Sequence, residues 1–89
     1  MNIYDYNKIL KDIENAEIDE KINLYNHSYL DNVIFRHWLD NGDVYLFVTK
    51  MTSIYGYHTS ISKFYKTLKM AKRMFIKHFL LEQLKNVTH

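Results

Sequence analysis

The chain has 89 residues, of which 47% are hydrophobic and 25% charged, so its composition is that of one globular domain rather than of a disordered chain. It contains no cysteine, no proline and only two glycines, which excludes disulfide scaffolds, thiolate zinc sites and glycine-rich phosphate loops. No apolar run approaches the ~18 residues of a membrane span, and the N-terminus lacks a signal peptide's apolar core, so we expect a soluble cytoplasmic domain.

The net charge of +2 conceals a strong asymmetry between the two halves of the chain. Residues 1–43 carry four Lys or Arg against nine Asp or Glu, whereas residues 44–89 carry eight Lys or Arg against Glu82 alone. Two interpretations are open. Either the halves neutralise each other within the fold, or the basic half offers a cationic face to a polyanion.

Residues 2–17 have the apolar spacing of an amphipathic helix. Asn2 suits the N-cap, and Asp5 places a negative charge in the first turn, where it favours the exposed amides. Apolar side chains recur every three or four positions along one side, at Ile3, Tyr6, Ile9, Leu10, Ile13 and Ala16.

Residues 18–32 favour a loop with one short strand, because Ile22 and Leu24 alternate with polar residues. The alternative is a short second helix that begins at Asp19, a residue that suits an N-cap.

Residues 33–51 are the clearest predicted element, a β-hairpin. Two runs rich in β-branched and aromatic residues flank Asn41-Gly42, which is typical of hairpin turns because both central positions need a positive φ. With these two residues as the loop, Trp38 lies opposite Tyr45, and side chains alternate between two faces. The face that we expect in the core carries Val33, Phe35, His37, Leu39, Val44, Leu46 and Val48.

A third strand and a long helix complete the predicted fold. Residues 57–66 alternate as a strand does, and Thr67 suits the N-cap of a helix that runs to about Asn86. The apolar side of this helix carries Leu68, Met70, Ala71, Met74, Phe75, His78, Phe79, Leu81 and Leu84. The sequence thus predicts an α+β fold: an N-terminal helix, a three-stranded antiparallel sheet, and a long C-terminal helix packed on one sheet face.

The first candidate binding surface is a row of cations before and along the C-terminal helix: Lys63, Lys66, Lys69, Lys72, Arg73 and Lys77. Cations at one-turn spacing can contact several phosphates of a nucleic acid at once, and each contact releases a condensed counterion. The alternative is an ordinary solvated helix face, partly neutralised by the acidic half of the chain.

The second candidate surface is the other face of the predicted hairpin, where Arg36, Trp38 and Tyr45 lie together with Phe47. A cation interleaved with flat rings can bind a nucleic-acid strand by stacking, or can anchor a protein interface. The alternative is that the first helix covers this face and the rings belong to the core.

The sequence contains no motif for catalysis or metal binding. Its five histidines show no ligand spacing, and we expect His37 and His78 to be packing residues. It has no His-Glu-x-x-His, Gly-x-Ser-x-Gly or paired-carboxylate arrangement. We therefore expect no catalytic residue, no metal ligand and no cofactor.

Two local resemblances occur at the start of the C-terminal helix. The run Thr67-Leu68-Lys69-Met70-Ala71-Lys72 resembles the phosphate-gripping start of the second helix in double-stranded RNA-binding domains. Lys69, Ala71 and Lys72 match that pattern, whereas Leu68 replaces the family's first lysine and its Gly-x-x-His loop is missing. The junction from Phe64 through Ala71 resembles the strand-to-helix junction in the arm-binding domain of phage and transposon integrases, which is similar in having three strands and one helix.

In its general type the chain is similar to small phage or mobile-element proteins such as anti-CRISPR and other anti-defence inhibitors, being compact, cysteine-free and rich in Asn, Lys, Ile and Tyr. That similarity implies a non-enzymatic inhibitor that docks on a host nucleoprotein or its nucleic-acid-binding channel, without a membrane. Its charge would come from Lys69, Lys72, Arg73 and Lys77, and its anchors would be Arg36, Trp38 and Tyr45. The alternative is a direct DNA- or RNA-binding module that uses the same helix. Neither interpretation fixes the oligomeric state.

Overall fold

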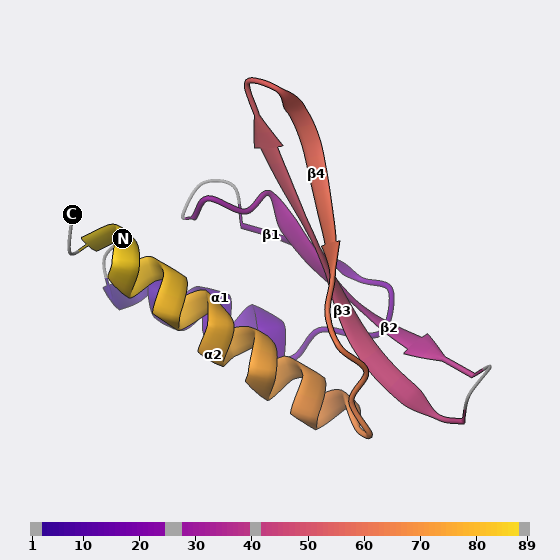
Figure 1. The fold of residues 1–89 in the computed structure, drawn as a ribbon. Coiled ribbons are helices and arrows are strands. Elements are labelled where there is room, and N and C mark those ends of the chain that lie inside the picture. The colour runs from indigo at the N-terminus through magenta and orange to yellow at the C-terminus, as the bar shows by residue number, and fades with distance from the viewer. Residues whose placement is uncertain (1–2, 25–27, 40–41, 88–89) are drawn as a thin grey trace.

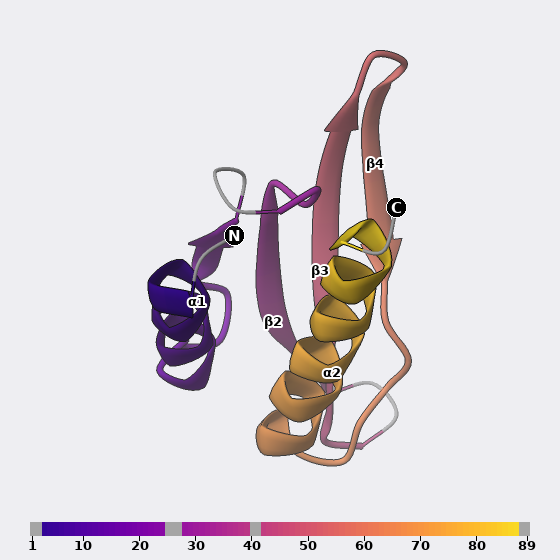
Figure 2. The same ribbon diagram turned by 90° about the vertical axis from the view of Figure 1, so that its left-hand side faces the viewer.

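A computed structural model of the chain describes residues 3–24, 28–39 and 42–87, and the side chains of residues 6–24, 28–39 and 42–82. Its elements are α1 (Ile3–Glu14), β1 (Lys21–Asn23), β2 (Asn32–Trp38), β3 (Val44–Ser53), β4 (Gly56–Ile61) and α2 (Leu68–Val87). The strands form one antiparallel sheet in the order β1-β2-β3-β4. Both helices lie against the same face of this sheet, and no described helix covers the other face (Figures 1 and 2).

The structure confirms the α+β class and raises the number of strands from three to four. The additional strand, β1, comes from residues 18–32, where the sequence favoured a loop with a short strand. It pairs with the first half of β2, with Ile22 opposite Val33. Just before it, Asp19 takes a φ of 68° and donates its amide to the Phe35 oxygen at 2.8 Å. Asp tolerates this left-handed conformation better than most residues, and the turn leads the chain from α1 to the edge of the sheet.

The β2–β3 hairpin has a different register from the predicted one. Trp38 lies opposite Val44, and residues 39–43 connect the strands in place of a two-residue loop. Gly42 has the expected positive φ, at 92°, whereas Asn41 lies outside the described residues. Because side chains alternate along a strand, this shift by one residue turns every side chain of β3 to the opposite face.

The observed register places Phe47 opposite Phe35 on the face that carries the helices. Phe75 of α2 meets both rings edge-on, with its centroid 6.0 Å from that of Phe35 and 5.2 Å from that of Phe47. Phe35 and Phe75 are fully buried, and Phe47 is 9% exposed. A phenylalanine ring removes more apolar surface from water than a leucine or valine, which explains why Phe47 faces the helix in place of Leu46 and Val48.

The core fills the space between this sheet face and the two helices. α1 contributes to it with the predicted spacing, although the helix ends at Glu14 rather than at residue 17, and Asn2 lies outside the described residues. The buried apolar residues of the core are Ile9, Ile13, Ala16, Ile22, Leu24, Leu30, Val33, Phe35, Phe47, Ala71, Phe75 and Phe79.

α2 begins where the sequence predicted. The Thr67 hydroxyl accepts a hydrogen bond from the Met70 amide at 3.0 Å and so caps the first turn. The buried side of the helix is narrower than predicted: Ala71, Phe75 and Phe79 are fully buried at a spacing of four residues, while Met70 is 44% exposed. The helix rests on the sheet along one stripe, so apolar side chains beside that stripe reach solvent.

β3 and β4 form a long hairpin that extends beyond the helices (Figure 1). Its turn occupies residues 54–55, and Gly56 follows with a φ of 117°. β4 is shorter than the strand predicted over residues 57–66, because the chain leaves the sheet after β4. It returns at Tyr65, which forms an isolated antiparallel bridge with Tyr45.

Candidate nucleic-acid interface

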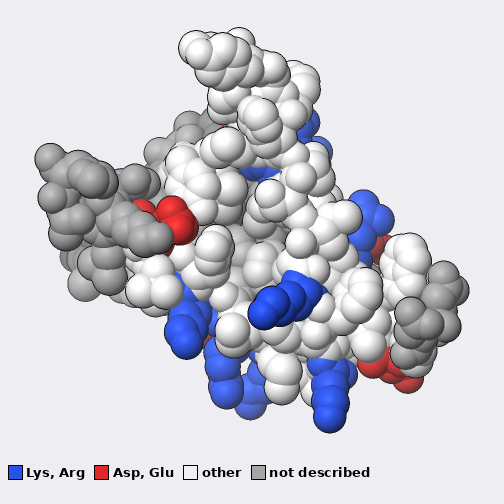
Figure 3. Space-filling view, viewed as in Figure 1, with Lys and Arg blue, Asp and Glu red and all other residues white. Residues whose placement is uncertain are grey.

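Exposed cations gather just before α2 and on its outward side. Lys63, Lys66, Lys69, Arg73 and Lys77 are all exposed, and from Lys66 onward they repeat every three or four residues. Residues at this spacing lie on one side of a helix. Figure 3 shows Lys and Arg side chains along the lower rim of the molecule, on the side of the helices. We call these five residues the α2 cationic row.

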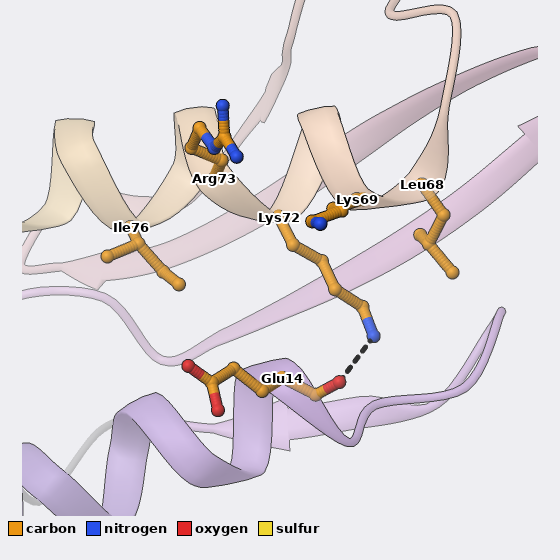
Figure 4. A pocket seen from close by; sticks show the side chains of 6 residues that line it. All are labelled: Glu14, Leu68, Lys69, Lys72, Arg73 and Ile76. Atoms are coloured by element: carbon orange, nitrogen blue, oxygen red, sulfur yellow. Dashed lines mark hydrogen bonds between the residues drawn. The ribbon is translucent and has the colours of Figure 1, made fainter.

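Lys72, the sixth cation predicted for this surface, points inward. Its ammonium donates to the main-chain oxygens of Glu14 at 2.9 Å and of Ala16 at 2.7 Å, across the space between α2 and the end of α1 (Figure 4). The ammonium also lies 6.0 Å from the centroid of the Phe35 ring. The last carbonyls of a helix lack partners within the helix and carry the negative end of its dipole, so a lysine there stabilises α1. Lys72 thus joins the two helices.

The α2 cationic row has no carboxylate partner in the part of the chain that the structure describes. The ion pairs found there are Arg36–Asp19 at 4.0 Å, with both side chains more than half exposed, and His37–Asp43 at 3.1 Å. Exposed pairs of this kind contribute little to stability. The described carboxylates of the acidic half therefore do not neutralise the row by direct contacts, and the row is exposed to solvent.

A groove of about 560 Å³ runs beside the row, between the start of α2 and the end of α1. Its lining residues are Glu14, Leu68, Lys69, Lys72, Arg73 and Ile76. Figure 4 shows that Lys72 crosses this space, whereas Arg73 points away from it, to the outward side of α2. The groove therefore has apolar walls at Leu68 and Ile76 and carries cations of the row at its rim.

The second predicted surface does not form. Tyr45 lies opposite His37, and Phe47 lies opposite Phe35, all on the helix side of the sheet. Arg36 and Trp38 lie on the other face. Tyr45 stacks on His37, with ring centroids 4.6 Å apart and an angle of 13° between the planes. The prediction that these side chains share one face was wrong, and its cause is the register shift in β3. Trp38, 47% exposed, and Arg36 remain together on the uncovered face.

The uncovered face of the sheet carries an aliphatic patch, a feature that the sequence reasoning missed. By the register, this open sheet face carries the aliphatic residues Ile34, Val44, Leu46, Val48 and Ile61, and its other residues include Arg36, Trp38, Lys50, Tyr57 and Thr59. Leu46 is 4% exposed although no described helix covers it, and Ile61 is 68% exposed. The alternation of apolar residues in β3 carried the signal, but the predicted register assigned these residues to the core.

A second groove, of about 630 Å³, lies on the helix side between α2 and the β3–β4 hairpin. Residues that line it include Thr49, Met51, His58, Ser60, Met74 and His78. Tyr29 lines it too, and burial, with a smaller effect from the charge of Glu82, raises the pKa of the Tyr29 phenol above its ordinary value. Tyr29 is therefore a neutral hydrogen-bonding group in this groove at neutral pH.

The described residues bring no metal-binding cluster together, since none of their His, Asp and Glu side chains form a group of three that could hold an ion. Neither of the two histidines that the sequence predicts as packing residues is buried, although His37 stacks on Tyr45. His37 is exposed, with Nε2 3.1 Å from an Asp43 oxygen, and His78 is exposed on α2. No helix in the described ranges is long and apolar enough to cross a membrane.

No family model, no curated protein and no solved structure matches this chain. The resemblances drawn from the sequence stay predictions. In the run that resembles double-stranded RNA-binding domains, the three matching residues have different environments. Ala71 is buried in the core, Lys72 binds the end of α1, and Lys69 is exposed.

Proposed function

We propose that the protein is a non-enzymatic binding protein that contacts the phosphate backbone of DNA or RNA with the α2 cationic row. One observation carries the proposal: five exposed cations share the outward side of α2 and its approach, and no carboxylate of the described chain pairs with them. Cations without a carboxylate partner among the described residues are available to replace the counterions condensed on a nucleic-acid backbone.

The length of the row suits a duplex. Lys69 and Lys77 are eight residues apart along α2, which corresponds to about 12 Å at a helical rise of 1.5 Å per residue. Over that length a DNA duplex carries about seven phosphates. Several cations can therefore reach phosphates without bending either partner. Backbone contacts carry no base information, so we expect binding with little sequence preference.

The sign of the charge favours nucleic acid itself over the nucleic-acid channel of another protein. A surface that binds nucleic-acid strands is cationic, so it would repel the α2 cationic row. Of the functions that the sequence suggested, direct contact with nucleic acid therefore fits this helix better than occupation of such a channel.

Inhibition of a host nucleoprotein is the second candidate function, and the open sheet face favours it. Trp38 is 47% exposed there, on the same face as Ile34, Val48 and Ile61. An aromatic residue among aliphatic ones is typical of the centre of a protein interface. In this form of the proposal, the α2 cationic row contacts the nucleic acid of the complex and the open sheet face contacts its protein.

Two charge-reversal variants distinguish binding through the α2 cationic row from an effect of the protein's net charge. Arg73→Glu with Lys77→Glu removes two outward cations, and Lys8→Glu with Lys11→Glu makes the same change in net charge on the exposed side of α1. In a mobility-shift titration with a mixed-sequence duplex, the first variant should bind roughly tenfold more weakly or worse, because two charge-assisted contacts are lost. The second should bind within about twofold of the unmodified protein, because these two cations lie on α1, outside the α2 cationic row.

Equal losses in the two variants would show that net charge alone matters and would contradict a contact by α2. If the unmodified protein does not bind naked DNA or RNA, direct contact is wrong and the docking function takes its place.

A further inference from the structure

β4 is an edge strand of the sheet, so some of its main-chain N–H and C=O groups point away from the other strands. In an antiparallel pair, hydrogen-bonded and non-hydrogen-bonded residue pairs alternate. The Ser62 amide donates to the Phe47 oxygen at 2.9 Å, and the register continues without interruption from there to the turn. Every second residue back from Ser62 therefore bonds to β3, and the N–H and C=O groups of Tyr57, Thr59 and Ile61 point away from it.

β4 also lacks the features that protect edge strands from pairing. Such strands are usually short, charged, bulged or interrupted by proline. β4 has six residues, none of them charged and none proline, and its register with β3 shows no bulge. The opposite edge, β1, has three residues and begins with Lys21. In Figures 1 and 2 no described helix or strand lies beyond β4, so this edge is open.

We propose that β4 pairs antiparallel with β4 of a second copy of the chain, which gives a twofold-symmetric dimer with one continuous sheet. The axis passes by Thr59, which lies opposite Thr59 of the other copy, and Tyr57 then lies opposite Ile61. In this register all three residues with outward main-chain groups form hydrogen-bonded pairs. A shift by one residue would place outward groups against inward ones and lose these bonds.

The side chains that this register brings together are compatible. Tyr57 is 72% exposed and Ile61 is 68% exposed, and both lie on the open sheet face, where each covers the other across the interface. On the helix side, His58 lies opposite Ser60. No like charges meet, because β4 carries none. The pairing thus removes large apolar side chains of both copies from water.

The dimer closes on itself and leaves room for its helices. Because both copies use the same edge, association stops at two, and the short β1 strands form the ends of the joined sheet. The two β3 strands are three strand spacings apart, about 14 Å, and helices about 10 Å across fit side by side over them. Both α2 helices lie on the same face, so the dimer presents two α2 cationic rows on one side.

Sedimentation of the protein without nucleic acid tests this pairing independently of the proposed function. The unmodified chain should sediment as a dimer. Because Lys50 lies opposite Thr59 in the same copy, the charged variants are made together with Lys50→Ala. In that background Thr59→Lys and Thr59→Glu each place like charges opposite each other at the axis, so each variant alone should be a monomer. An equal mixture of the two should form dimers again, because Lys then faces Glu. Thr59→Val keeps the shape of the side chain without charge and should remain a dimer.

Three outcomes would overturn the proposal. If the unmodified chain is a monomer, β4 does not pair with a second copy. Dimers that persist in both charged variants place the interface elsewhere. A mixture that stays monomeric while the unmodified chain dimerises contradicts the register at Thr59. Thr59 is exposed on the monomer, so the variants should keep the far-UV circular dichroism of the unmodified chain.

Discussion

Lys72 and Ala16 join the two helices at the point where α1 ends. The Lys72 ammonium lies 2.7 Å from the Ala16 oxygen and 2.9 Å from the Glu14 oxygen, and its side chain is partly buried. One cation of a basic helix thus serves the fold, while its neighbours Lys69 and Arg73 are exposed. This division decides which residues of α2 are available to a partner.

Replacing Lys72 with methionine tests its structural role. Lys72→Met keeps an apolar stem but removes the charged donor from two carbonyls, so we expect the free energy of unfolding to fall by about 1–3 kcal/mol. Lys69→Met is the matched control one turn away and exposed, and it should change stability by less than about 0.5 kcal/mol. Urea denaturation measures both values. Equal effects of the two substitutions would contradict the capping contact.

Engineered disulfides can read the β2–β3 register directly, because the chain has no cysteine of its own. His37 lies opposite Tyr45 in the structure, whereas a two-residue loop would place Trp38 there. His37→Cys with Tyr45→Cys should therefore crosslink on mild oxidation, since the two Cβ atoms lie on the same face of adjacent strands. Trp38→Cys with Tyr45→Cys should keep free thiols. Mass spectrometry distinguishes the two, and the reverse result would restore the shorter loop.

Substitutions at Gly42 measure the free-energy cost of a left-handed backbone conformation by itself. Its φ is 92°, and an added Cβ would meet no atom within 4 Å, so a substitution there costs backbone strain and no steric clash with neighbours. Gly42→Val should lower the free energy of unfolding by more than about 1 kcal/mol. Gly42→Asn should cost less, because Asn tolerates positive φ. Thermal unfolding of both variants checks this, and an unchanged midpoint for Gly42→Val would contradict the conformation.

Local chemistry was enough to predict the helices but not the pairing of the strands. Thr67 could be identified as an N-cap because capping depends on residues within one turn. The register of β3 depends on distant packing. Both faces of β3 are apolar, with Leu46 and Val48 on one and Phe47 on the other, so alternation alone does not choose between them. The ring of Phe75, on a helix distant in the sequence, decides which face is buried.

The candidate site, like the fold, could be predicted from the sequence only in part. The spacing of Lys69, Arg73 and Lys77 indicates a shared helix side, and the structure leaves all three exposed. The inward direction of Lys72 could not be predicted, because it depends on where α1 ends in space. The proposed grouping of Trp38 with Tyr45 failed for the same reason as the register, since one residue more or less in a loop moves a strand's side chains to the other face.

The salt dependence of binding tests the central claim most directly. If the five cations of the α2 cationic row contact phosphates, a plot of log K against log salt for a mixed-sequence duplex should have a slope of about −4.5 per bound chain between about 50 and 200 mM. Arg73→Glu with Lys77→Glu should make that slope shallower, at about −2.7, because two contacts are lost. Lys8→Glu with Lys11→Glu should leave it unchanged. A slope that is the same for the unmodified chain and for the Arg73/Lys77 variant would contradict the claim that α2 binds the nucleic acid.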